Sequence, residues 1–232
     1  QARVQAAGEP ERLQLEPALS RRGPLPELAA APGVLLYDIE SDPDARDDFL
    51  HGFVVVPRGS VGDWPGADAA QMAGWRYVPL LARIEHGEAR LWGRLQALLV
   101  RYPDWPLLHY GETESIALVR LAKRMGAREG EVAALRSRLV DVHARLRQHW
   151  RLPVNSYGLK AVASWRGFRW SQSGVDGARC LLWWRQWRRD WAQPQAAPDP
   201  VASRRALERI FTYNRDDNLA TWAVARWLLD QA

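Results

Sequence analysis

The sequence contains little cysteine and no long apolar run. Cys180 is the single cysteine among 232 residues, which excludes an internal disulfide and an all-cysteine metal site. No stretch reaches the roughly 18 apolar residues of a membrane-spanning helix, and the N-terminus lacks the basic-then-apolar pattern of a secretory signal. We therefore expect a cytoplasmic protein without a membrane partner.

Positive charge is in moderate excess. Thirty-two Lys and Arg against 27 Asp and Glu give a formal net charge of +5, with a pI near 9.8. Such an excess favours a polyanionic partner. The apolar fraction of 47% and charged fraction of 25% are typical of a globular protein.

The chain begins at Gln1 rather than methionine, and we interpret it as a fragment or a processed product. Residues 1–31, rich in Ala, Pro, Glu and Arg, are predicted to be a linker or N-terminal arm. Residues 32–232 are predicted to form one domain, with a helical insertion at about 143–200.

Three strands are predicted early in that domain, at 34–40, 49–56 and 75–82. The Asp- and Pro-rich turn at 41–48 joins the first two, and the short connections indicate an antiparallel meander. A short apolar strand is expected at 105–110. Residues 139–142 fit either a strand or a helix, because periodicity alone does not distinguish the two.

Helices are predicted in most of the remaining chain. Helical periodicity and breakers place them at 88–100, 112–125, within 129–150, at 156–165 and 180–191. After a proline-rich connection at 192–200, two final helices are expected at about 201–213 and 216–229. A meander followed by alternating strands and helices predicts a mixed α/β sheet with helices packed on it.

Asp38 and Glu40 are the first candidate site residues. They lie two apart on a strand, so their side chains leave the same face. Their strand is apolar on both faces and therefore central, and its carboxyl end is where open α/β sheets place their sites. Two buried carboxylates need a compensating cation. The alternative is a strand that simply runs into an acidic turn.

Two further segments supply acidic side chains. Tyr213 and Asp217 are four apart, which on a helix places them on one face. The alternative is that Asn214 or Asp216 caps the last helix. Glu114 follows a strand-to-helix junction at 109–112, where the helix dipole alone would favour an acid.

Together these segments resemble a known family. The order D-x-E, an acid at a strand-to-helix junction, and Y-x-x-x-D resembles the DEDD exonucleases, including the proofreading domains of DNA polymerases. A closer similarity is to the ribonuclease-H-like, YprB-type domain in the C-terminal half of predicted RecB-family nucleases. It covers the chain from about Val34 to the C-terminus and rests on five ordered motifs: Tyr37-Asp38-Ile39-Glu40, His109-Tyr110-Gly111, Ser156-Tyr157-Gly158-Leu159-Lys160, Gly167-Phe168-Arg169-Trp170 and Tyr213-Asn214-x-Asp216-Asp217-x-x-Ala220-Thr221.

The resemblance implies a ribonuclease-H-like fold, with a mixed sheet of an antiparallel three-strand meander plus parallel strands flanked by helices. It implies that Asp38, Glu40, Glu114 and Asp217 are metal ligands, and that Tyr213 positions the attacking water. The implied activity is two-metal phosphodiester hydrolysis, like that of a 3′–5′ exonuclease, with Mg²⁺ or Mn²⁺ at an all-oxygen site. Full-length relatives carry an N-terminal RecB-like nuclease domain. In one departure, Glu114 stands where the proofreading pattern has Asp.

The segment 165–191 interleaves six Trp with six Arg residues. Such a mixture can bind single-stranded DNA or RNA through stacking and phosphate contacts. The spacing of Trp184, Trp187 and Trp191 instead predicts a buried helical stripe. The predicted nucleic-acid contacts are Lys160, Arg185, Arg188 and Arg189.

Two other classes of function stay open. The domain could be a catalytically silent ribonuclease-H-like module that binds nucleic acid or positions a partner nuclease. It could also be an interaction domain that uses the Trp-rich helix for protein contacts. The intact set of four acids favours the active nuclease.

Overall fold

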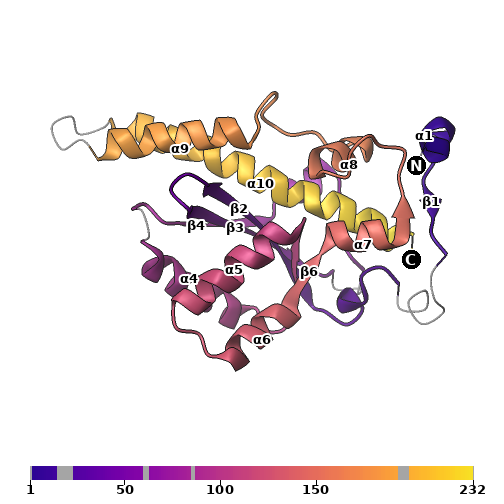
Figure 1. The fold of residues 1–232 in the computed structure, drawn as a ribbon, viewed down its shortest axis with the longest axis horizontal. Coiled ribbons are helices and arrows are strands. Elements are labelled where there is room, and N and C mark those ends of the chain that lie inside the picture. The colour runs from indigo at the N-terminus through magenta and orange to yellow at the C-terminus, as the bar shows by residue number, and fades with distance from the viewer. Residues whose placement is uncertain (1, 15–22, 60–62, 85–86, 193–198, 232) are drawn as a thin grey trace.

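The computed structural model describes residues 2–14, 23–59, 63–84, 87–192 and 199–231. Its centre is a mixed five-stranded sheet in the order β4-β3-β2-β5-β6 (Figure 1). The strands are β2 (Gly33–Asp42), β3 (Asp47–Pro57), β4 (Arg76–Leu81), β5 (Leu107–His109) and β6 (Leu139–Asp141). β2, β3 and β4 are antiparallel neighbours, whereas β5 and β6 run parallel to β2. The predicted meander plus parallel strands is confirmed, and residues 139–141 are a strand.

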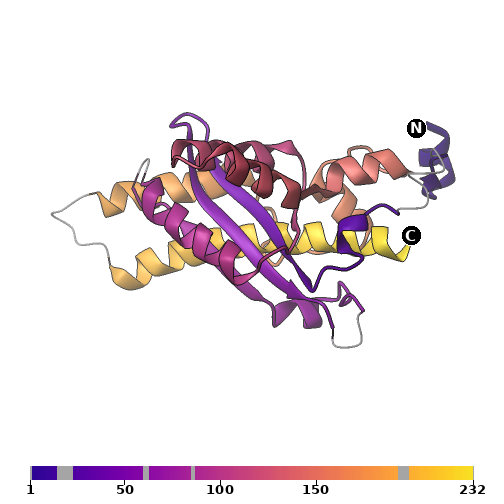
Figure 2. The same cartoon turned by 90° about the horizontal axis from the view of Figure 1, so that it is seen from below.

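Helices cover both faces of the sheet (Figure 2). One layer contains α4 (Glu88–Arg101), α5 (Glu112–Arg124) and α6 (Glu129–Arg138), and the other contains α7 (Val142–His149), α8 (Leu159–Trp165) and α10 (Pro200–Asp230). The alternation along β2 divides its side chains as predicted. Val34 and Leu36 pack in the α10 layer, and Leu35, Tyr37 and Ile39 pack in the α4–α5 layer. Among the described residues, none of the helices combines the length and the apolar composition that a membrane span requires.

The C-terminal segment is one helix of 31 residues, α10. The prediction of two helices, broken between residues 213 and 216, is wrong. Asn214 and Asp216 lie inside the helix, so neither caps its beginning; Asp199 does, accepting from the backbone N–H of Val201 at 2.9 Å. The side chains of Asn214 and Asp216 instead bind other parts of the fold. A helix of this length spans about 46 Å.

Helix α9 (Gly177–Trp191) lies beside α10 and begins three residues before its predicted start, where the Asp176 side chain caps it. Trp184 and Trp187 are buried, but Trp191 is 48% exposed. The predicted buried stripe is therefore wrong for Trp191, the last residue of the helix. Phe49, Trp184, Trp187 and Trp191 form a stacked column with ring centroids 4.3, 5.3 and 5.2 Å apart.

The N-terminal segment contacts the domain at several places. It contains α1 (Ala2–Ala7), β1 (Glu11–Arg12) and the 3-10 helix η1 (Pro26–Leu28), and β1 pairs antiparallel with β7 (Trp150–Arg151). Leu25 and Leu28 are buried in the α10 layer of the core. Residues 15–22 of the predicted arm, and 193–198 of the proline-rich connection, lie outside the described residues. The short helix α3 (Ala69–Ala73) precedes β4.

Candidate active site and metal centre

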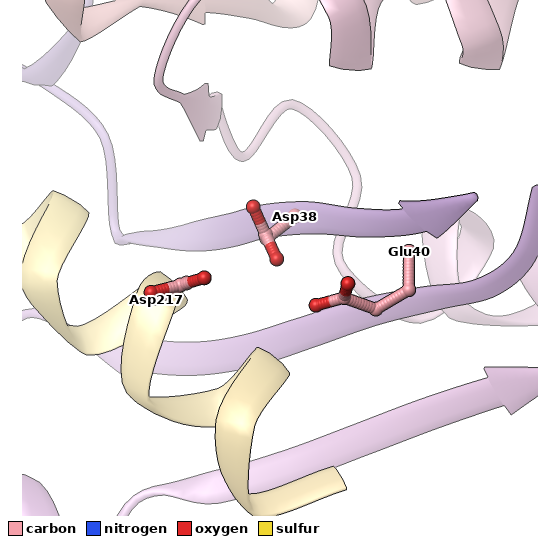
Figure 3. A group of neighbouring side chains, drawn as sticks. All are labelled: Asp38, Glu40 and Asp217. Carbon is pink, nitrogen blue, oxygen red and sulfur yellow. The ribbon is translucent and has the colours of Figure 1, made fainter. Parts of the chain in front are cut away.

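Three carboxylates converge between the central strand and the long helix. Asp38 and Glu40 project from β2, and Asp217 projects from α10 toward them (Figure 3). One oxygen of each lies within 4.8 Å of the others. The D-x-E pair and the helix acid, separated by about 180 residues in sequence, therefore form one cluster as predicted.

Asn214 links the two carboxylates of β2. Its amide nitrogen donates to Asp38 Oδ2 at 2.7 Å and lies 3.5 Å from Glu40 Oε1, while its Oδ1 accepts from the Tyr77 hydroxyl at 2.8 Å. Gly52, paired with Asp38 across the sheet, provides the room, because a Cβ there would lie 1.6 Å from Asn214 Oδ1. The site thus depends on a glycine in the neighbouring strand.

Asp217 is hydrogen-bonded by side chains from two segments and lies in the electrostatic field of a third. Trp170 Nε1 donates to Asp217 Oδ1 at 2.6 Å, and the Tyr213 hydroxyl, one turn earlier on α10, also hydrogen-bonds to Asp217. The Lys160 ammonium lies 5.1 Å from the centre of the Tyr213 ring, donates to the Val175 carbonyl at 2.5 Å and favours the charged form of Asp217. The hydrogen bond between Tyr213 and Asp217 confirms the predicted proximity of these two side chains.

Glu114 lies beside the cluster on the first turn of α5. It is not one of the three acids within 4.8 Å, but its charge raises the pKa of Asp38. Its Oε2 is buried and has no hydrogen-bond partner in the described structure. Gly111, the residue before α5, has a φ of 106°, a backbone conformation that favours glycine. This turn starts α5 at the point where Glu114 can face the site.

Burial dominates the electrostatics of the four acids. It raises the pKa of Glu40 to about 8, of Glu114 to about 7 and of Asp217 to about 6, and raises that of Asp38 well above its usual range. The charge of Asp217 raises the pKa of Asp38 and Glu40 further. Hydrogen bonds from Trp170 to Asp217, and from Asn214 and Cys180 to Glu40, act in the opposite direction. The charged forms of these acids are therefore costly without a cation.

These residues fit a hard divalent cation. All the converging ligand atoms are carboxylate oxygens, which suit Mg²⁺ and Mn²⁺ better than zinc. The unpartnered Glu114 Oε2 and the mutual repulsion of the acids would both be relieved by a bound positive ion. The chemistry of the site is thus consistent with the ligand set expected from the sequence.

A cavity of about 780 Å³ opens onto the acids. Asp38 and Asp217 line one part of it, and Tyr110, Tyr157 and Lys160 line another. The two tyrosines are fixed at their hydroxyls: Tyr110 donates to the Tyr157 carbonyl at 2.6 Å, and Tyr157 accepts from the backbone N–H of Leu152 at 2.8 Å. The cavity therefore has rigid aromatic walls, and the Lys160 ammonium lies in the same lining as Asp38 and Asp217.

The three α9 arginines predicted to contact nucleic acid, Arg185, Arg188 and Arg189, lie elsewhere, and two of them contact acids at the β2–β3 turn. Arg185 binds both oxygens of Asp42, at 2.8 and 2.5 Å, and Asp44 at 2.6 Å. Arg188 lies 3.9 Å from the buried Asp47, and the exposed Arg189 donates to the Gln186 side chain. Arg185 thus fastens α9 to the sheet, and a nucleic-acid contact for the three arginines stays a prediction.

Several residues of the site were not predicted from the sequence. Asn214 lies three positions before Asp217, a helical spacing that shares its face, and that spacing was a usable signal. The contacts of Trp170, Cys180, Tyr77 and Gly52 join segments far apart in sequence, and no local pattern indicates them.

Comparison with known proteins gives one family. A scan against protein-family models matches residues 35–229 to the model described as the RNase_H superfamily. No curated protein matches significantly. The match covers the sheet, both helical layers and all four acids.

Proposed function

The chain belongs to the RNase H superfamily, and from that premise we propose that it is a metal-dependent nuclease of the DEDD type. It would hydrolyse phosphodiester bonds of DNA or RNA from the 3′ end. The observation that carries the proposal is the convergence of Asp38, Glu40 and Asp217 within 4.8 Å, with the unpartnered Glu114 beside them. An N-terminal RecB-like nuclease domain in the full-length protein is part of the same proposal.

Asp38, Glu40, Glu114 and Asp217 would hold two Mg²⁺ or Mn²⁺ ions. When bound, such ions act as Lewis acids on a phosphate and lower the pKa of a water molecule. Trp170 and Asn214 fix the orientation of Asp217 and Asp38 through hydrogen bonds. The ligands would therefore be aligned before the substrate arrives, which limits the reorganisation that the reaction requires.

Tyr213 would orient the attacking water. Burial and then the charge of Asp217 raise the pKa of its phenol, so the hydroxyl stays protonated at neutral pH. It binds Asp217 and lines the cavity of about 780 Å³. Its oxygen keeps lone pairs that can accept from a water molecule beside the acids.

The cavity would receive the end of a single strand. Tyr110 and Tyr157 offer rigid aromatic surfaces for a nucleobase, and Lys160 offers a cation for a phosphate. An extruded or single-stranded end suits a cavity of this size better than a paired one.

One observation favours the silent-module alternative. Oxygens of Asp38 and Asp217 already accept hydrogen bonds from Asn214 and Trp170, which partly satisfies the site in the absence of a cation. A binding module with such a site would bind strands without cutting them. An interaction domain would show no response to divalent cations.

The proposal is tested by incubating the protein with 5′-labelled single- and double-stranded DNA and RNA in Mg²⁺ or Mn²⁺. We expect products that shorten progressively from the 3′ end, and none in EDTA. Glu40→Gln should be inactive, whereas Glu129→Gln, on the exposed side of α6, should match the unmodified protein. Binding without cleavage in every metal would favour the silent module, and cleavage unaffected by Glu40→Gln would refute the assigned site.

A further inference from the structure

A second hollow, of about 670 Å³, lies beside α5 and α6, the helices of the layer opposite α10. We call it the α5–α6 groove. Four cations line it: Arg120, Lys123 and Arg124 from α5, and Arg136 from α6. Asp141 is the one carboxylate among its lining residues in the described chain. The groove is therefore predominantly basic.

Two of the cations are held in place from one side. Arg120 Nη2 donates to Asp48 Oδ2 at 2.6 Å, and Arg124 Nη2 pairs with Glu88. The side chains of Asp48 and Glu88 are only 6% and 7% exposed, whereas those of the arginines are 49% and 37% exposed. A guanidinium carries five N–H donors, so each arginine is anchored to a buried acid and keeps other donors for a ligand.

The other two cations are weakly engaged. Lys123 lies 3.6 Å from Glu129, whose side chain is 85% exposed, and such a surface pair contributes little. Arg136 is exposed and, within the described ranges, has no acid at ion-pair distance. Their charges are thus available to an anion.

The groove also has apolar walls. Ile116 is 54% exposed, and Val119 and Leu139 are half-buried beside it. Cations interleaved with exposed apolar surface suit a strand that presents both phosphates and bases, whereas an isolated phosphate would use the cations alone.

The groove and the cavity of the acidic site share one boundary. Gly111 lines the cavity and donates its N–H to Asp141 Oδ1 at 3.0 Å, and Asp141 lines the groove. His109, also in the groove wall, binds the Gly111 carbonyl at 2.6 Å. Both hollows therefore meet at the carboxyl ends of β5 and β6, where His109 and Asp141 are paired in register.

We infer that the α5–α6 groove binds the single strand beyond the nucleotide at the acidic site, across the ends of β5 and β6. This inference rests on the proposed function. The face of α5 from Ser115 to Lys123 is about 12 Å long. At about 3.4 Å per stacked nucleotide, it accommodates three to four nucleotides.

The test measures binding of fluorescent oligothymidylates of 2 and 12 nucleotides to the Glu40→Gln protein in Ca²⁺, by anisotropy. Into this parent we introduce Lys123→Glu with Arg136→Glu, both exposed positions. The matched control is Arg90→Glu with Arg204→Glu, which gives the same change in net charge at exposed positions on α4 and α10. Melting temperatures show whether each variant is folded. Lys123→Gln with Arg136→Gln replaces the Glu double variant if the latter does not fold.

The parent and the control should bind the 12-mer more tightly than the 2-mer, which is too short to span the groove. The groove variant should lose about tenfold in affinity for the 12-mer, and its salt slope should fall by about 0.7 per lost phosphate contact. Its affinity for the 2-mer should be nearly unchanged. An unchanged 12-mer affinity, an equal loss for both lengths, or a parent without length dependence would overturn the inference. Failure of metal-dependent cleavage would refute the proposed function alone, because these binding measurements need no turnover.

Discussion

Glu40→Gln should stabilise the metal-free protein at alkaline pH. Glu40 is buried, with 8% of its residue surface exposed. Burial is the larger cause, and the charge of Asp217 the next, of a rise in its pKa from 4.5 to about 8. A raised pKa means that the fold favours the protonated acid. Stability from this group is complete below about pH 4.5 and is lost as the pH rises through about 8.

The size of the effect follows from the shift. At about 1.4 kcal/mol per pKa unit, a rise from 4.5 to about 8 corresponds to about 5 kcal/mol of lost stability above pH 8. Glutamine removes the charge and keeps an oxygen that can accept from Cys180 and Asn214. We expect the variant to exceed the unmodified protein by about 3 to 5 kcal/mol at pH 8.5 in EDTA, and to differ by less than about 1 kcal/mol at pH 4.5.

Urea denaturation at several pH values measures this difference. His51, whose pKa burial lowers to about 4, destabilises the fold as the pH falls below 6.5, but it does so in both proteins and cancels. Glu129→Gln is the exposed control and should show no difference at either pH. Saturating Mn²⁺ should stabilise the unmodified protein far more than Glu40→Gln. A difference that is independent of pH, or a variant less stable at pH 8.5, would refute the reasoning.

Three further substitutions test other parts of the structure. Asp217→Asn should abolish hydrolysis in the nuclease assay, whereas Asp216→Asn, which alters the contacts with Ser171 and the ion pair with Arg215, should keep a substantial part of it; the opposite result would mean the wrong acid was assigned. Gly52→Ala should lower the free energy of unfolding by about 2 kcal/mol or more in urea denaturation, because its Cβ would overlap Asn214; wild-type stability would contradict that packing. Arg185→Ala should lower the free energy of unfolding in the same assay, because it removes the hydrogen bonds to Asp42 and Asp44, and a strand-binding defect without loss of stability would instead support the predicted nucleic-acid contact.

Local sequence patterns predicted the two faces of the central strand and the shared helical face of Tyr213 and Asp217. The alternation along residues 34–40 indicated a central strand with two apolar faces, and both cores contain the expected side chains. The spacing of Tyr213 and Asp217 indicated one helical face, and the two side chains are in contact. The resemblance connected these segments, and the family match over residues 35–229 supports that connection.

Tertiary contacts determined the features that the sequence did not predict. The polar run at 214–216 suggested a helix break, because Asn and Asp compete for nearby backbone groups. In the structure Asn214 binds Asp38 and Asp216 binds Ser171, so α10 continues through both. The ion pair between Arg185 and Asp42 joins residues 143 apart, and no periodicity indicates that partner.

The central claim is that the carboxylates of β2 and α10 hold divalent cations, and calorimetric titration with Mn²⁺ tests it most directly. The unmodified protein should bind two ions, because Asp38, Glu40 and Asp217 converge and the charge of Glu114 acts on Asp38 from beside them. Asp38→Asn should lose most of this binding, since Asp38 lies in the three-acid cluster and interacts with Glu114, whereas Asp216→Asn should retain it. Equal Mn²⁺ binding by the unmodified protein and Asp38→Asn, or no binding by either, would contradict the account.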